Sequence, residues 1–148
     1  MNSKIFLVVG AGDHAKAEET AFRSALSSTR NIVIISIVDS FLYHYGHTDV
    51  INTRPSKRAF LLHVRSEALQ KAADAAQAVR ERANAKGIAA EIIPVETDDP
   101  AAAIAYLARE EKSGAVYIPL EKTRFFPLLK RSLATDLRRK LSAQVVAC

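Results

Sequence analysis

Two short stretches of the chain are apolar at nearly every position. Lys4 to Val9 reads KIFLVV, and Asn31 to Asp39 reads NIVIISIVD, with Ser36 as its one polar interior residue. Strands buried on one face alternate apolar and polar residues, whereas strands of a parallel sheet are covered on both faces and are apolar throughout. The two stretches therefore predict strands of a parallel sheet with helices on both sides.

The rest of the chain alternates helical and strand patterns. The expected elements are a helix over 14–28, a helix over 57–86 that Gly87 ends, a strand over 89–96, a helix from Pro100 to Gly114, a strand over 115–120, a helix over 127–141 and a strand over 143–148. Asp99 precedes its helix as an N-cap, and Pro94 within its strand indicates a sheet edge. This alternation predicts an α/β doubly wound sheet with right-handed crossovers.

The composition excludes several classes of protein. With 148 residues, of which 49% are hydrophobic and 25% charged, we expect one globular domain over 1–148. No apolar run approaches the roughly 20 residues of a membrane span, and the apolar start is too short for a signal peptide. Cys148 is the one cysteine, so no disulfide can form within the chain. These features indicate a cytoplasmic protein.

Four blocks of the sequence together resemble a universal stress protein over nearly the whole chain. They are FLVVGAGDHAKAEETAFRSAL, IVDS, DDPAAAIAYLAREEKSGAVYI and LLKRSLATDLRRKLSAQVVAC, and the Asp99-Pro100 helix start is the most specific element. The resemblance implies a five-stranded parallel sheet flanked by helices, the nucleotide-binding-like fold of adenine nucleotide alpha hydrolase-like proteins. It also implies a homodimer in which the last strand, 143–148, pairs with its copy.

Nucleotide-binding members of this family have an Asp in the loop after strand one and a G-x2-G-x9-G-S/T pattern after strand four. The glycines let backbone N–H groups approach phosphates, and the following helix N-terminus favours negative charge. Here Ser132 matches the last position, but Ile118, Glu121 and Arg131 stand at the glycine positions and Ala11 at the Asp position. We therefore expect the usual ATP site to be absent and no cofactor to be needed.

A phosphate-bearing ligand held by side chains is the alternative. Ligands of doubly wound sheets bind at the carboxyl ends of strands near the switch point. The candidate binding residues in those loops are Gly10, Gly12, Asp13, Asp39, Lys122, Arg124, Arg131 and Ser132. Arg131 would place a guanidinium where phosphates otherwise lie, so the pocket is either filled or holds a smaller anion. We favour ATP, AMP or phosphate binding less than the absence of a ligand.

The net charge of +5 comes from one segment. The segment from Glu121 to Lys140 contains seven basic and two acidic residues. Its excess of five positive charges equals the net charge of the whole chain. Arg131 and Arg138 are seven residues apart and share a helix face. This face is either a docking surface for phosphate or an acidic protein, or a solvated face of no specific role, which we favour. We do not expect nucleic-acid binding, because no binding module is recognisable.

Two small clusters invite a chemical interpretation. His44, His47 and Asp49 lie in a Tyr- and His-rich loop and could seed a metal site, but a closed zinc site needs a fourth ligand, and we favour a surface loop. Asp13 and His14 could act as acid and base, but an Asp directly before a helix is by default an N-cap. No Ser or Cys nucleophile with a placed base can be identified, so we expect no catalytic residues.

These patterns leave three hypotheses for the function. The first is a non-catalytic, dimeric, universal stress protein-like module for stress response or regulation, which acts through protein contacts. The second is a variant that binds a phosphate-bearing molecule through the basic loop and helix start at 119–132. The third, a nucleotide hydrolase, is the least favoured because both the Asp and the glycines are missing.

Overall fold

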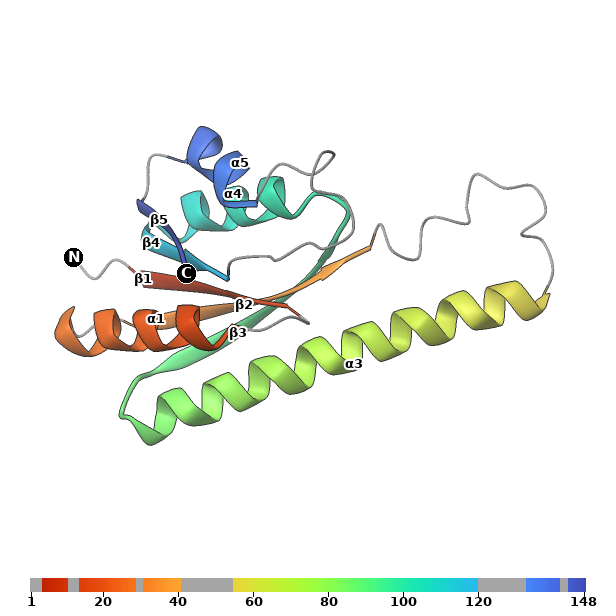
Figure 1. Cartoon of the computed structure of the whole chain (residues 1–148), viewed down its shortest axis with the longest axis horizontal. Helices are drawn as coiled ribbons and strands as arrows, with labels where there is room; N and C mark the ends of the chain where they lie inside the picture. Colours follow the sequence, from red (N-terminus) through yellow and green to blue (C-terminus); the bar gives the residue numbers. More distant parts are fainter. Residues whose placement is uncertain (1–3, 11–13, 29–30, 41–54, 120–132, 142–143) are drawn as a thin grey trace.

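A computed structural model of the chain describes residues 4–10, 14–28, 31–40, 55–119, 133–141 and 144–148. Its centre is a five-stranded, all-parallel sheet with the strand order β3-β2-β1-β4-β5 (Figure 1). The strands are β1 Lys4–Val9, β2 Ile32–Asp39, β3 Ala90–Thr97, β4 Ser113–Ile118 and β5 Gln144–Ala147. The helices are α1 Ala15–Ser28, α3 Pro55–Ala85, α4 Pro100–Glu110 and α5 Leu133–Lys140. The predicted doubly wound α/β architecture is confirmed.

The helices cover both faces of the sheet. Helices α1 and α3 lie on one face, and α4 and α5 lie on the other (Figure 1). Alternate residues of the central strands serve the two cores: Ile5 and Leu7 face α1 and α3, while Phe6 and Val8 face α4 and α5. Both faces of the first two strands are therefore covered, as their almost entirely apolar sequences predict. None of the helices in the described ranges is long and apolar enough to cross a membrane.

Two predicted helix boundaries are confirmed with their expected chemistry. Gly87 follows α3 with φ 77°, its N–H bonds to the Asn84 carbonyl, and the Ile88 N–H bonds to the Ala83 carbonyl. This pattern is a Schellman motif, which satisfies carbonyls at the helix end. At the start of α4, the Asp99 carboxylate accepts a hydrogen bond from the Ala102 N–H at 3.2 Å, and proline occupies the first turn.

The predicted end of α4 is wrong. Gly114 was expected to end the helix that begins at Pro100, but α4 ends at Glu110 and Gly114 lies inside β4. The left-handed turn is made two residues earlier by Lys112, with φ 52°. A non-glycine residue can adopt this conformation at some energetic cost, so the position of a glycine alone does not fix a helix end. Strand β4 accordingly covers 113–118 rather than 115–120.

The sheet has β3 at one edge and β5 at the other. Pro94 lies in β3, opposite Ser36 of β2, which confirms the edge predicted from this proline.

At the amino ends of the strands, Lys4 Nζ lies 2.7 Å from the Glu111 carboxylate and 3.3 Å from that of Glu91. Hydrogen bonds to Glu111 and then Glu91 raise the pKa of Lys4 above its ordinary value. This lysine ties the edge strand to the middle of the sheet.

Helix α3 is much longer than the strands it covers. It has 31 residues, about 46 Å at the usual rise, whereas β2 has eight residues, about 26 Å. Figure 1 shows its amino-terminal half extending past the carboxyl edge of the sheet. Phe60 and Leu62 in this half are 63% and 64% exposed. The fully buried residues of α3 therefore lie in its second half, whereas Leu61, Ala68 and Leu69 of the first half are partly buried against Val38 and Ala72.

Candidate functional site

The carboxyl ends of the strands form one edge of the sheet, and the strand order reverses there between β1 and β4. Ligands of doubly wound sheets bind at such a switch point, because the loops after the two neighbouring strands diverge. Gly10 follows β1 directly, Asp39 ends β2 and Ile118 ends β4. The structure thus brings these three positions to the same edge of the sheet.

Gly10 and Asp39 differ in how far they extend along that edge. Val9 pairs with Ser36, so Gly10 lies level with Ile37, and β2 continues two residues further to Asp39. A Cβ built on Gly10 would lie 3.8 Å from the nearest atoms of Ile37, which is an ordinary contact distance. The described neighbours therefore leave room for a side chain at Gly10, and Asp39 projects beyond it.

Ile118, which the sequence comparison without gaps matches to the first glycine of the phosphate-loop pattern, is a core residue. Ile118 is 2% exposed and belongs to the apolar cluster on the α4/α5 face. It pairs with Ala147 of β5, and its carbonyl accepts a hydrogen bond from the Cys148 N–H at 3.0 Å. The Ile118 side chain therefore belongs to the core, and its carbonyl bonds to the residue that follows β5.

Most of the predicted site residues lie outside the described residues. The predicted ligand-binding residues concerned are Gly12, Asp13, Lys122, Arg124, Arg131 and Ser132, and the candidate metal ligands are His44, His47 and Asp49. Within the described ranges, no group of three or more His, Cys, Asp or Glu side chains is placed to hold a metal ion. Both sets therefore stay predictions.

An ion pair that the sequence analysis did not identify joins the two helices on one face. Glu18, in the first turn of α1, accepts two hydrogen bonds from Arg82 of α3, the Nη2 to Oε2 bond being 3.0 Å long. The Glu18 side chain is 11% exposed and that of Arg82 51%. The hydrogen bonds that Arg82 donates to Glu18 raise the pKa of Arg82 above its ordinary value. The sequence does contain one indication that Glu18 is buried, because it lies at helical spacing from the buried Ala21 and Phe22.

His14 lies next to this pair rather than in an arrangement of its own. Its Nε2 atom is 3.8 Å from the Glu18 carboxylate, and its carbonyl accepts the Glu18 N–H at 2.9 Å. That second bond is the first of α1, so the helix begins one residue later than expected. His14 therefore stands where α1 begins, and the acid–base role weighed for Asp13 and His14 stays untested.

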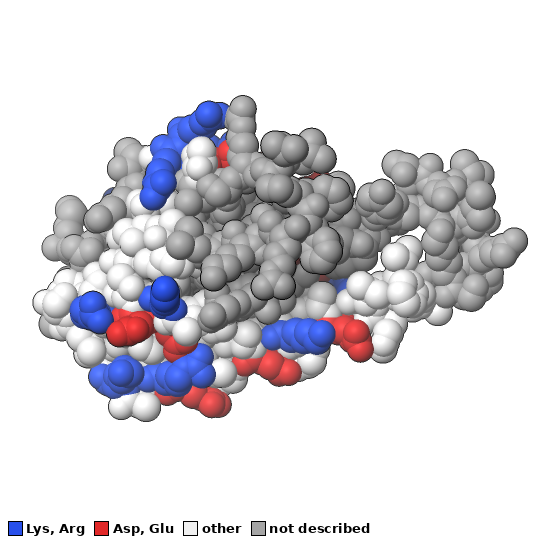
Figure 2. Space-filling model, viewed as in Figure 1, with Lys and Arg blue, Asp and Glu red and all other residues white. Residues whose placement is uncertain are grey.

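The basic residues of α5 lie in its last turn. Arg138, Arg139 and Lys140 are exposed at the carboxyl end of the helix, which returns toward the amino ends of the strands. Figure 2 shows basic side chains grouped over α5, whereas basic and acidic ones alternate over α1 and α3. Cations are favoured at a helix carboxyl end by the helix dipole. These three residues therefore lie at the end of α5 that points away from the carboxyl edge of the sheet.

No protein-family model and no curated protein sequence matches the chain. Solved structures match it over nearly its full length. A hypothetical protein whose biochemical function was assigned from its structure aligns with a TM-score of 0.74 at 14% identity, covering 99% of this chain and 96% of that one. Universal stress protein UspA from Lactobacillus plantarum aligns with a TM-score of 0.67 at 16% identity, covering 99% and 98%.

A third match holds a ligand. The universal stress protein from Archaeoglobus fulgidus in complex with dAMP aligns with a TM-score of 0.56 at 17% identity, covering 98% of this chain and 96% of that one. At such low identities the likeness shows the fold alone. The architecture expected from the sequence blocks is confirmed by these structures, and the chain has the universal stress protein fold.

Proposed function

We propose that the chain is a non-catalytic, homodimeric regulatory module of the universal stress protein kind that acts in the cytoplasm through contacts with other proteins. The observation that carries this proposal is the burial of Ile118, the residue that matches a glycine of the nucleotide-binding pattern when the sequence is placed on it without gaps. A phosphate can approach a backbone closely only where no bulky side chain intervenes. With isoleucine there, and Glu121 and Arg131 at the other two glycine positions, the usual phosphate loop has no counterpart in the sequence.

The proposed dimer forms through β5. This strand lies at the edge of the sheet and is bonded to β4 on its inner side. Parallel strands leave N–H and C=O groups unpaired along a sheet edge, and a second copy can supply their partners. Arg138, whose guanidinium donates a hydrogen bond to the Val145 carbonyl at 3.4 Å, lies directly beside β5. With Arg139 and Lys140 it gives the dimer a basic surface that would suit an acidic partner protein.

The second candidate function is the binding of a phosphate-bearing molecule at the switch point. Two observations favour it: Gly10 and Asp39 meet at this edge, and a protein of the same fold is in complex with dAMP. Charge from Lys122, Arg124 and Arg131, together with the Ser132 hydroxyl, would replace the backbone contacts of the usual loop. In that case Arg131 is the residue on which affinity depends most.

Native mass spectrometry of the purified chain, alone and with ATP, AMP or inorganic phosphate, separates the two candidates. For the first we expect a dimer whose mass none of the three compounds changes. A retained or added nucleotide that is lost in Arg131→Ala, but kept in the control Arg139→Ala, would replace the first candidate by the second. A monomer would contradict the dimer, and ATP turnover that persists through further purification would contradict both candidates.

A further inference from the structure

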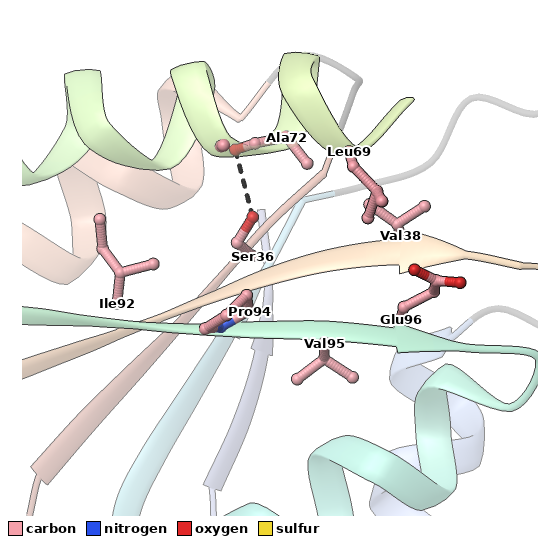
Figure 3. A pocket seen from close by; sticks show the side chains of 9 residues that line it. Ser36, Val38, Leu69, Ala72, Ile92, Pro94, Val95 and Glu96 are labelled. Carbon is pink, nitrogen blue, oxygen red and sulfur yellow. Dashed lines mark hydrogen bonds between the residues drawn. The ribbon is translucent and has the colours of Figure 1, made fainter. Parts of the chain in front are cut away.

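A hollow of about 340 Å³ lies between α3 and the outer two strands, on the face opposite α4 (Figure 3). It is lined by Ser36, Val38, Leu69, Ala72, Ala73, Ile92, Pro94, Val95 and Glu96. Ser36, Val38 and Ala72 are buried and form its floor, while Ala73, Pro94 and Glu96 are exposed and form its rim. The hollow is therefore open to solvent on one side and closed by the core on the other.

Small side chains account for the hollow. Ser36 and Pro94 face each other in the register of β2 and β3, and α3 presents Ala72 and Ala73 to them. Interiors are normally packed without voids of this size, and Val or Leu at any of these positions would fill part of it. Ser36 is also the one polar residue inside the otherwise apolar run of β2, so the sequence exception and the hollow coincide.

The two polar side chains of the lining can only accept hydrogen bonds from a guest. The Ser36 hydroxyl donates a hydrogen bond to the Ala72 carbonyl at 3.1 Å, as Figure 3 shows. The lone pairs of the Ser36 oxygen can then accept a hydrogen bond from a ligand. The Glu96 carboxylate at the rim accepts two hydrogen bonds from Arg65, at 3.0 and 3.1 Å. The other lining side chains are apolar. An apolar molecule with a single N–H or O–H group would match this arrangement.

We propose that the hollow binds a small, uncharged ring compound that donates one hydrogen bond to the Ser36 hydroxyl. An apolar cavity of about 150 Å³ accommodates benzene, so the hollow has room for two fused rings. Ser36 is 4% exposed, so a donor buried beside it would be shielded from water. This site is distinct from the switch point, since it lies under α3 rather than beyond the strand ends, and it does not depend on the proposed function.

Indole and indene test the proposal, because they have nearly the same shape and only indole has an N–H group. The ¹⁵N-labelled full chain is titrated with each compound and followed by amide chemical shifts. We expect indole to shift Ser36, Leu69 and Ala72, and indene to bind about tenfold more weakly for lack of one hydrogen bond. Shifts confined to other regions, or none up to the solubility limit of indole, would overturn the proposal.

Two variants localise the effect. Ala73→Phe places a ring across the rim and should abolish indole binding, whereas Ala85→Phe, at another exposed alanine of α3, should leave it unchanged. Ser36→Ala should bind indole and indene with about equal affinity. Circular dichroism should confirm that each variant is folded. Equal preference in wild type and Ser36→Ala would overturn the hydrogen bond. Self-association that Ala73→Phe abolishes would show that the hollow holds a second copy instead.

Discussion

The two halves of α3 belong to the same helix but are stabilised differently. In the second half, Ala72, Ala76, Val79 and Ala83 recur at helical spacing and are at most 3% exposed against the sheet and α1. In the first half, none of the described side chains from 59 to 71 is buried. One half therefore has a fully buried face, whereas the other is only partly buried, through Leu61, Ala68 and Leu69.

This difference separates local from tertiary stabilisation of a helix. Residues 59–71 are mostly good helix formers such as Ala, Leu, Arg, Glu, Gln and Lys. Such propensities alone stabilise a short helix only marginally in water, and most helical stability in proteins comes from packing of an apolar face. The first half is helical as a continuation of the second, so substitutions of the same type should have very different effects in the two halves.

The largest contrast is expected between two valines. Val79 is fully buried, so Val79→Ala removes two methyl-sized groups from the core and should lower the free energy of unfolding by roughly 2 kcal/mol. Val64→Ala, in the first half, should change it by less than about 0.5 kcal/mol. Urea denaturation of both variants measures the contrast. Equal losses would show that the first half is packed against something in solution.

Two of the ion pairs of α3, one in each half of the helix, should also differ in their contribution to stability. Arg82→Met leaves the Glu18 carboxylate, at 11% exposure, without its partner, and we expect a loss of roughly 1–2 kcal/mol, reduced by the exposure of Arg82. His63 and Glu67 form a 3.2 Å pair in which both side chains are more than half exposed. Glu67→Gln should therefore have no measurable effect. If Arg82→Met lowered the free energy of unfolding at neither low nor high salt concentration, the Glu18–Arg82 pair would contribute nothing to stability.

The end of the packed half offers the smallest of the three effects. Gly87 has φ 77°, and a Cβ there would meet no atom within 4 Å, so Gly87→Ala tests backbone strain without a clash. We expect a loss of about 1 kcal/mol, with an unchanged denaturant m-value because the same surface is buried. Thermal and urea unfolding report it. A neutral result would mean that the helix end relaxes to another turn.

Features that depend on one residue type with one conformational role could be predicted from the sequence. Gly87 ends a helix, Asp99 and Pro100 begin one, and Pro94 marks an edge strand, since each acts through its own backbone or the next turn. Gly114 was the exception, because Lys112 adopts the left-handed conformation in its place. Local rules therefore identify what can end a helix and do not say which of two residues does so.

Features that depend on residues far apart in the chain could not be predicted. The Glu18–Arg82 pair joins residues 64 positions apart, and the hollow needs the register of Ser36 against Pro94 together with the placement of Ala72. At the candidate site, the sequence correctly placed Gly10 and Asp39 at one edge, because the carboxyl ends of parallel strands meet there. It could not tell that α5 brings Arg138 to the Val145 carbonyl of β5.

Pro94 also limits how the sheet can grow. A proline has no N–H group, so the outer strand β3 lacks a donor in its middle that an added strand would need. Extension of the sheet is therefore directed to β5. In the proposed dimer, the two copies would pair through β5 and leave a proline-interrupted edge at both ends. Assembly by this route has a fixed stoichiometry and stops at two chains, rather than continuing into a fibre.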